Sequence, residues 1–206
     1  MFADYQIFQD RLSSLEQVWL EQGAPIGRHL APGASPSHLE AIEGRLGHAI
    51  PPELRALWSW HDGVAQPDER VSSVRTIGPG SWEFLSSTEA VDHRDWRRSQ
   101  WRGDPDAGDD ASWEGQWRSA WLPFFQMDAY ALFSDCRQVA PTGTVPIRYY
   151  AHVPDDVFTP LAGSLRQVLD VWVFVLQRRY RYWDESVGGW EVSIDPSLPL
   201  IIQQLA

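Results

Sequence analysis

The stretch LGHAIPPELRALWSWHDGV, residues 46–64, sets the start of the fold. Gly47 is expected to end one helix, because glycine readily takes the left-handed conformation found just past a helix C-terminus. Pro52 can start the next helix, since its missing N–H would lack an intrahelical partner there. The residues that then share one helix face are Leu54, Leu57, Trp58 and His61. Gly63 is expected to close this second helix, so the stretch predicts a tight helical corner.

Residue patterns on both sides of the corner predict the remaining elements. Ser35 and Pro36 are typical of a helix start, and a capping box joins Ser86 to Glu89. Predicted helices cover residues 4–21, 36–46, 52–61, 86–101 and 164–182. Predicted strands lie within residues 73–78, 81–86, 129–135, 144–153 and 190–194. Because strands and helices do not alternate regularly, we predict a single α+β domain with a mostly antiparallel sheet flanked by helices and a helical hairpin near the N-terminus.

The 206-residue chain carries a formal net charge of −11, and all 17 of its basic residues are arginines. A negative field disfavours nucleic-acid binding, which depends on phosphate contacts, and suits a basic protein partner, although it also fits an acidic protein that is simply soluble. No apolar run reaches the roughly 18 residues that span a bilayer, and the first residues lack the pattern of a signal peptide. Cys136 is the single cysteine, which excludes an internal disulfide. These features predict a cytoplasmic protein that binds neither membrane nor nucleic acid.

The sequence lacks the motifs of common catalytic and metal sites. There is no glycine-rich phosphate loop, G-x-S-x-G elbow or H-E-x-x-H pair, and the six histidines show no metal-ligand spacing. The segment DPDAGDD at 104–110 departs from a calcium loop, because Gly115 stands where a bidentate glutamate is needed. Cys136 is expected to be buried and inert, and His61 to interact with a helix C-terminus. We therefore predict no catalytic residue, no metal and no cofactor.

An acidic, turn-forming segment between the predicted helix at 86–101 and the strand region is the candidate surface for binding a partner. Its candidate contact residues are Asp104, Asp106, Asp109, Asp110, Trp113, Glu114 and Trp117. Trp113, Trp117 and Trp121 recur every four residues, so one side of a short helix could present all three. Tryptophan concentrates where interfaces are strongest, whereas aspartates attract a basic partner. The alternative is that these tryptophans cover the core beneath a solvated loop.

Two separated segments resemble the SUKH superfamily, named partly for the Smi/Knr regulators of yeast cell-wall assembly. In PSHLEAIEGRLGHAIPPELRALWSWHDGV, the matching positions are Glu43, Leu46, Gly47, Ile50, Pro51 or Pro52, Leu54 and Gly63. In WLPFFQMDAYALFSDC, they are Trp121, Leu122, Pro123, Leu132 and Asp135. The helix that starts at GSLRQVLDVW corresponds to the last helix of the family. One departure is that the family usually has glycine near the MDAY turn, where this chain has Ala129 and Tyr130.

This resemblance implies an α+β domain over residues 1–182, with its core at about 33–180 and a C-terminal extension at 183–206. Bacterial members of the superfamily are mostly immunity proteins that bind and neutralise toxins, many of them nucleases. The resemblance therefore implies a non-catalytic, protein-binding domain whose partner is a cognate toxin. Two alternatives stay open at this point: a regulatory scaffold without a toxin partner, like the yeast proteins, and an enzyme whose site is dispersed along the sequence.

Overall fold

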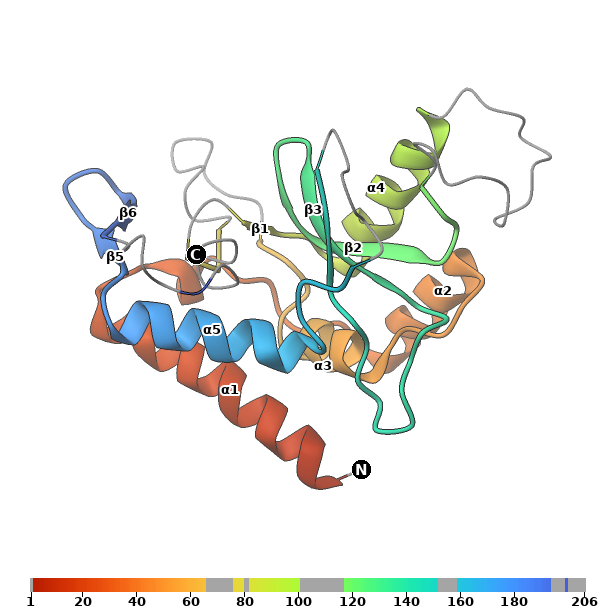
Figure 1. The fold of residues 1–206 in the computed structure, drawn as a ribbon, viewed down its shortest axis with the longest axis horizontal. Helices are drawn as coiled ribbons and strands as arrows, with labels where there is room; N and C mark the ends of the chain where they lie inside the picture. Colours follow the sequence, from red (N-terminus) through yellow and green to blue (C-terminus); the bar gives the residue numbers. More distant parts are fainter. Residues whose placement is uncertain are drawn as a thin grey trace.

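The computed structural model describes residues 2–65, 76–79, 82–100, 117–151, 159–193 and 199, without the side chains of residues 2–5. The helices in these ranges are α1 (Phe2–Glu21), the short 3-10 helix η1 (Ile26–Arg28), α2 (Pro36–Leu46), α3 (Pro52–Trp60), α4 (Ser87–Ser99) and α5 (Leu165–Gln177). The strands are β1 (Glu83–Phe84), β2 (Trp121–Met127), β3 (Tyr130–Asp135), β4 (Arg148–Tyr150), β5 (Arg181–Asp184) and β6 (Gly189–Val192). Figure 1 shows their arrangement.

The main sheet has the order β1-β2-β3-β4, and all of its neighbouring strands run antiparallel. Strands β5 and β6 form a separate antiparallel hairpin. The register of β2 against β3 shifts between Pro123 and Phe125, so that the successive rings of Phe124 and Phe125 are both buried in the core. The predicted α+β class with a mostly antiparallel sheet is confirmed.

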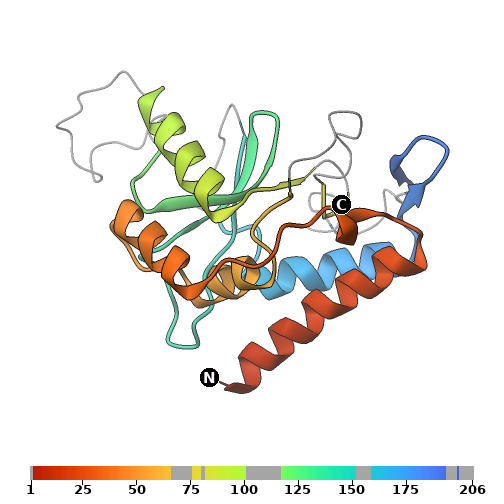
Figure 2. The ribbon, with the colours of Figure 1, turned by 180° about the vertical axis from the view of Figure 1, so that it is seen from behind.

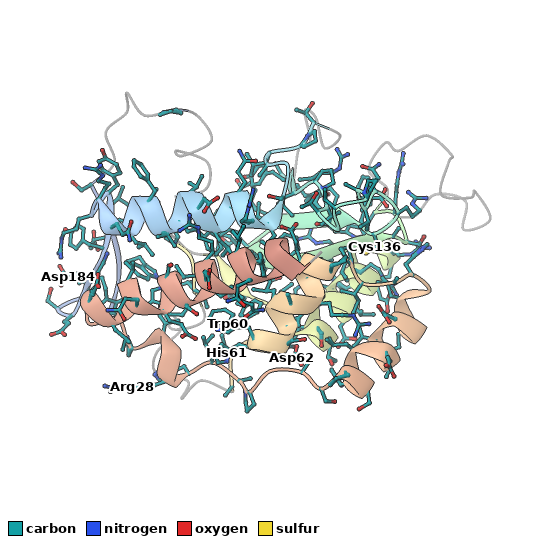
Figure 3. All side chains as sticks on the ribbon, turned by 90° about the horizontal axis from the view of Figure 1, so that it is seen from below. Arg28, Trp60, His61, Asp62, Cys136 and Asp184 are labelled. Atoms are coloured by element: carbon teal, nitrogen blue, oxygen red, sulfur yellow. The ribbon has the colours of Figure 1, made fainter. Side chains whose placement is uncertain are left out.

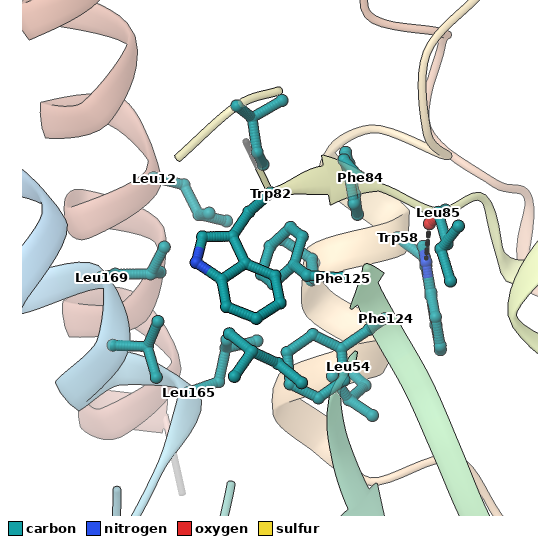
Figure 4. Close-up of a cluster of buried hydrophobic side chains, with 14 of the residues drawn as sticks. Leu12, Leu54, Trp58, Trp82, Phe84, Leu85, Phe124, Phe125, Leu165 and Leu169 are labelled. Carbon is teal, nitrogen blue, oxygen red and sulfur yellow. Dashed lines mark hydrogen bonds between the residues drawn. The ribbon is translucent and has the colours of Figure 1, made fainter. Parts of the chain in front are cut away.

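Two hydrophobic clusters use opposite faces of the sheet. Leu132 of β3 and Tyr149 of β4 face the main core, whereas Ala131, Phe133 and Tyr150 alternate toward a smaller cluster. Helices α1 and α5 lie side by side along one side of the molecule, while α4 packs against β2 and also contacts α2 (Figures 1 and 2). In the main core, the indole of Trp82 lies among apolar side chains from α1, α5 and β2 (Figure 4). One contiguous core therefore joins the helices to the sheet.

The α2–α3 corner forms largely as predicted. The Ser35 hydroxyl accepts the His38 N–H at 3.2 Å, and Gly47 ends α2 at a φ of 74°. Helix α3 begins at Pro52 and ends at Trp60, and the extended backbone of His61 caps it, so the expected closing role of Gly63 was wrong. Gly63 has a φ of 79°, and a Cβ there would lie 2.6 Å from the Ser86 nitrogen. It lets α3 and the start of α4 approach closely.

Helix α5 and strand β4 are shorter than their predicted ranges. Helix α5 ends at Gln177, not at 182, because Arg179 takes a φ of 54° and the chain turns into β5. Strand β4 is confined to Arg148–Tyr150, with residues 152–158 outside the described ranges. The turn between β2 and β3 has its positive φ, 50°, at Asp128, and aspartate adopts this conformation more readily than most residues with a Cβ.

The β5–β6 hairpin packs onto the main core and crosses the predicted domain boundary at residue 182. Trp183 is buried and meets Trp190 edge to face at 5.5 Å. The amide of Gln22 donates to the Leu176 carbonyl and accepts the Trp183 N–H, both at 2.8 Å. One polar side chain thus ties α1, α5 and the hairpin together. The division at 182 stays a prediction, and most of the predicted tail beyond 193 lies outside the described residues.

Candidate functional site

Most of the predicted interface falls outside the described part of the chain. This applies to Asp104, Asp106, Asp109, Asp110, Trp113 and Glu114. The described residues on either side are Gln100, after the end of α4, and Trp117, just before β2. These two flanks meet in space, because the Arg97 guanidinium of α4 lies 4.9 Å from the centre of a Trp117 ring. The site can therefore be built from what surrounds both ends of the acidic segment.

Trp117 belongs to a small buried set that we call the outer aromatic cluster. Its members are Trp117, Trp121, Ala131 and Phe133, with Tyr150 packed against them. Trp117 is 3% exposed, and its indole N–H donates to the Trp121 carbonyl at 2.8 Å. Residues 117–120 are not helical and Trp121 begins β2, so the short helix was wrong for this part of the chain. For Trp117, burial fits the alternative in which the ring covers the core.

Arg97 covers this cluster from α4. Its guanidinium lies 5.0 Å from the centre of the Tyr150 ring and donates to the Ala129 carbonyl at 3.2 Å. The rings and the carbonyl offset part of the cost of burying the cation. Burial nevertheless lowers the pKa of Arg97 below its ordinary value. The side chain therefore fastens the end of α4 to the sheet.

A groove of about 440 Å³ runs beside Arg97, between α4 and the β2–β3 turn. We call it the α4 groove. Its lining residues are Asp92, His93, Trp96, Arg97, Gln126 and Asp128. Trp96 is 55% exposed, which is unusual for so large an apolar ring. Large exposed aromatic surface beside polar groups is typical of interaction sites.

The α4 groove carries an excess of negative charge. Asp92 and Asp128 line it, while Glu83 and Glu89 are near enough to act electrostatically on His93. Burial, followed by the neighbouring Arg97, holds the pKa of His93 below its ordinary value despite these carboxylates. The imidazole is then neutral at pH 7, and the carboxylates dominate the field of the groove.

The family-matching acidic residue of the α2–α3 corner, Glu43, has internal partners instead. Glu43 accepts the Ile50 N–H at 2.8 Å and pairs with Arg55 at 2.6 Å. This carboxylate holds the linker between Gly47 and Pro52 in place, while Leu54 is fully buried beneath it in the core. The family-matching residues of the corner thus have structural roles.

The family-matching residues of the sheet are structural as well. Pro123 is buried at the bulge of β2, and Trp121 pairs in register with Asp135. The Asp135 carboxylate accepts three hydrogen bonds from the backbone and guanidinium of Arg137, each at 3.0 Å. Burial acts to raise the pKa of Asp135, but the hydrogen bonds from Arg137 and Trp121 outweigh it and hold that pKa below its ordinary value.

Sequence reasoning missed two charged residues that position this framework. Glu53 is buried in α3 and accepts the N–H groups of Leu165 and Arg166 at the start of α5, at 3.1 and 3.2 Å. Arg94 of α4 donates to the Leu46 carbonyl at the end of α2, at 3.0 Å. A charged residue on the apolar face of a predicted helix is the signal that could have found both.

The described side chains include one serine–histidine contact of the kind that hydrolases use. The Ser87 hydroxyl lies 3.1 Å from His38 Nε2, but Ser87 is fully buried, and Asp62 approaches the same nitrogen at 3.6 Å. A carboxylate that orients a catalytic base contacts its other nitrogen, and a nucleophile must be accessible. Asp62 instead accepts the Ser87 N–H at 2.6 Å, which fixes the start of α4. This cluster is structural.

Two further residues singled out in the sequence have structural surroundings. His61 caps the C-terminus of α3 through its backbone N–H, which donates to the Leu57 carbonyl at 3.1 Å. Its side chain contacts the Ala31 carbonyl at 2.7 Å and Glu16 at 3.4 Å, so the ring joins the end of α3 to α1 (Figure 3). Burial raises the pKa of Cys136 to about 12, so its thiol is protonated at neutral pH and a poor nucleophile. Within the described residues, no set of three acidic, histidine or cysteine side chains could hold a metal ion.

Comparison with known proteins assigns the framework to a family. No curated protein matches the chain significantly. In the ranges that the structure describes, no helix combines the length and apolar character needed to cross a membrane. The model of the SMI1/KNR4 family (SUKH-1) matches residues 33–170, which contain the α2–α3 corner, the main sheet and the start of α5. The chain therefore belongs to the SMI1/KNR4 family, SUKH-1.

Proposed function

We propose that this chain is a non-catalytic, protein-binding domain of the immunity type, which binds and neutralises a cognate toxin domain. The observation that carries this proposal is Trp96, a largely exposed indole in a negatively charged groove of a SUKH-1 framework. Glu43, Glu53 and Asp135 of the framework accept hydrogen bonds from their own chain. Asp92, which holds one exposed ion pair with Arg45, and Asp128 line a groove that a partner could enter. A toxin with a basic surface suits this face.

The acidic segment is the second part of the proposed interface. Asp104, Asp106, Asp109, Asp110, Trp113 and Glu114 lie between α4 and Trp117, whose contact with Arg97 keeps both flanks beside the α4 groove. Together with the net charge of −11, these carboxylates would speed the encounter with a basic partner. In this proposal, charge governs the association rate, and aromatic surface supplies the affinity of the complex.

The test searches the genes next to the gene of this chain for a toxin domain and expresses the domain that is found. Co-expression of the chain should restore growth of cells that produce the toxin domain. Reversing Asp106, Asp109 and Asp110 to arginine should slow association about tenfold or more at low salt and weaken its salt dependence. The melting temperature should not fall, because the substitutions remove no apolar side chain.

A matched control reverses Glu21, Glu40 and Glu185, which are exposed and lie away from the groove. This control changes the net charge by the same amount as the triple aspartate reversal. If it slows association as strongly, the effect comes from net charge alone, and the acidic segment is not part of the interface. Failure to protect cells or to bind the toxin domain would overturn the immunity function. Specific binding to proteins of cell-wall assembly would then favour the regulatory scaffold.

A further inference from the structure

The α4 groove combines an accessible aromatic face with carboxylates on its rim. Trp96 presents about half of its surface to solvent, and Asp128 is exposed at the tip of the β2–β3 turn. Asp92, one turn before Trp96 on α4, lines the same groove. An indole face attracts cations through its ring electrons, and a neighbouring carboxylate adds hydrogen bonds and charge attraction.

Arg97, a cation in the wall of the groove, does not cancel the attraction of the groove for a positively charged partner group. The guanidinium of Arg97 lies 4.9 Å from the centre of a Trp117 ring and 5.0 Å from that of Tyr150, and it donates to the Ala129 carbonyl. It is further, 5.9 Å, from the centre of a Trp96 ring, and Trp96 remains 55% exposed. Two cations, Arg97 and the Arg45 that pairs with Asp92, stand against four carboxylates in and around the groove: Asp92, Asp128, Glu83 and Glu89. His93 adds no charge at neutral pH. The balance of charge in and around the groove is negative, and it suits a cationic occupant.

The chain itself shows that a guanidinium can reach this rim. Arg45 of α2 pairs with Asp92 at 2.6 Å, and both side chains are about half exposed. An exposed pair of this kind contributes little free energy, so a better-placed cation can displace Arg45 or share the carboxylate. Asp128 has no ion-pair partner within the described part of the chain. At least one carboxylate is thus open to a partner.

We propose that the α4 groove binds an arginine or lysine side chain of the partner protein, which stacks on Trp96 and is held by the carboxylates of Asp92 and Asp128. This inference rests on the proposed protein-binding function and names the chemistry that the partner must bring to this site. The partner side chain takes the surface of the Trp96 ring that the Arg97 guanidinium, 5.9 Å from the centre of that ring, leaves exposed.

The test needs no toxin, because it measures the groove directly in the full chain. The probe is the peptide acetyl-Gly-Arg-Gly-amide, and its control is the same peptide with citrulline, which keeps the shape of arginine without the charge. The readout is the nuclear magnetic resonance signal of the Trp96 indole N–H. The variant Trp96→Phe identifies this signal among the indoles of 12 tryptophans.

The arginine peptide should shift the Trp96 signal saturably, and the citrulline peptide should bind at least about threefold more weakly. Replacing Asp92 and Asp128 by asparagine should weaken the binding of the arginine peptide by a similar factor. Asparagine is a suitable replacement because it tolerates the positive φ of residue 128. The Arg45→Gln variant should strengthen binding, because it frees Asp92. Glu40→Gln, an exposed carboxylate on α2 outside the groove, should leave binding unchanged.

Three results would overturn the inference: equal binding of the two peptides, tighter binding of acetyl-Gly-Glu-Gly-amide, or shifts that depend on protein concentration and so indicate a second copy in the groove. The unfolding temperature of each variant checks that the fold is intact. If Trp96→Ala leaves the affinity for a protective toxin partner unchanged, the inference that the groove binds this partner is wrong, although the immunity function holds. If the peptide binds as expected but no toxin domain binds, the inference about the groove holds and the immunity function is wrong.

Discussion

The framework of the α2–α3 corner and the β2–β3 ladder differs from the α4 groove in how it uses charge. In the framework, Glu43, Glu53 and Asp135 each accept hydrogen bonds from their own chain. In the groove, Asp92 holds one exposed pair and Asp128 faces solvent. Internal bonds make a carboxylate part of the fold, whereas an exposed one remains available to a partner. The carboxylates that stabilise this fold are thus distinct from those that are available to bind a partner.

A matched pair of tryptophan substitutions tests the comparison most strongly. Trp58 of α3 is fully buried and donates to the Leu85 carbonyl at 3.0 Å. Trp58→Ala leaves a cavity and an unpaired carbonyl, and should lower the free energy of unfolding by about 3–5 kcal/mol. Urea denaturation measures this change. A loss below about 1 kcal/mol would mean that the corner is not part of the rigid core.

An intermediate effect is expected at the end of β3. Asp135→Asn should lower the free energy of unfolding at pH 7 by about 1–2 kcal/mol, because the bonds to Arg137 lose their charge. The folded-state pKa of Asp135 is depressed, so its stabilisation is present above the unfolded value near pH 4 and is lost as the pH falls through the folded value. The difference between wild type and variant should therefore shrink toward pH 3. A difference independent of pH would contradict this.

The smallest effect on stability is expected in the groove. Trp96→Ala removes a ring that is already more than half exposed, and should change the free energy of unfolding by no more than about 0.5 kcal/mol. Measured beside Trp58→Ala, it gives the sharpest contrast between the two regions. If Trp96→Ala destabilised the chain as strongly as Trp58→Ala, the indole would belong to the framework and the comparison would fail.

Local signals explain why much of the framework was predictable from sequence. The Ser35–Pro36 start, the Gly47 stop and the Ser86–Glu89 capping box act within a few residues, and the structure confirms each of them. The end of α5 was missed because the apolar pattern continues through Tyr180, whereas strand pairing from Arg181 overrides it. Propensity reports local preference, and pairing with β6 is a tertiary effect.

The site was harder to predict because it depends on contacts between distant segments. Glu53 meets α5 more than a hundred residues further along the chain. The exposure of Trp96 follows only once the buried face of α4 is known, and the helical pattern of α4 did not distinguish it from core tryptophans such as Trp82. For Asp104 to Glu114, the proposed role in binding stays a prediction.

The bridge made by Gln22 has a consequence for dividing the chain into fragments. The family match ends at residue 170, inside α5, yet Trp172 and Leu176 beyond it are fully buried. Helix α1 lies before the match, and Gln22 fastens it to both α5 and the hairpin. A fragment trimmed to 33–170 would expose this apolar surface and lose its cooperativity. We therefore expect the unit that folds to be larger than the segment that the family match covers, and a fragment for expression should include at least residues 2–193.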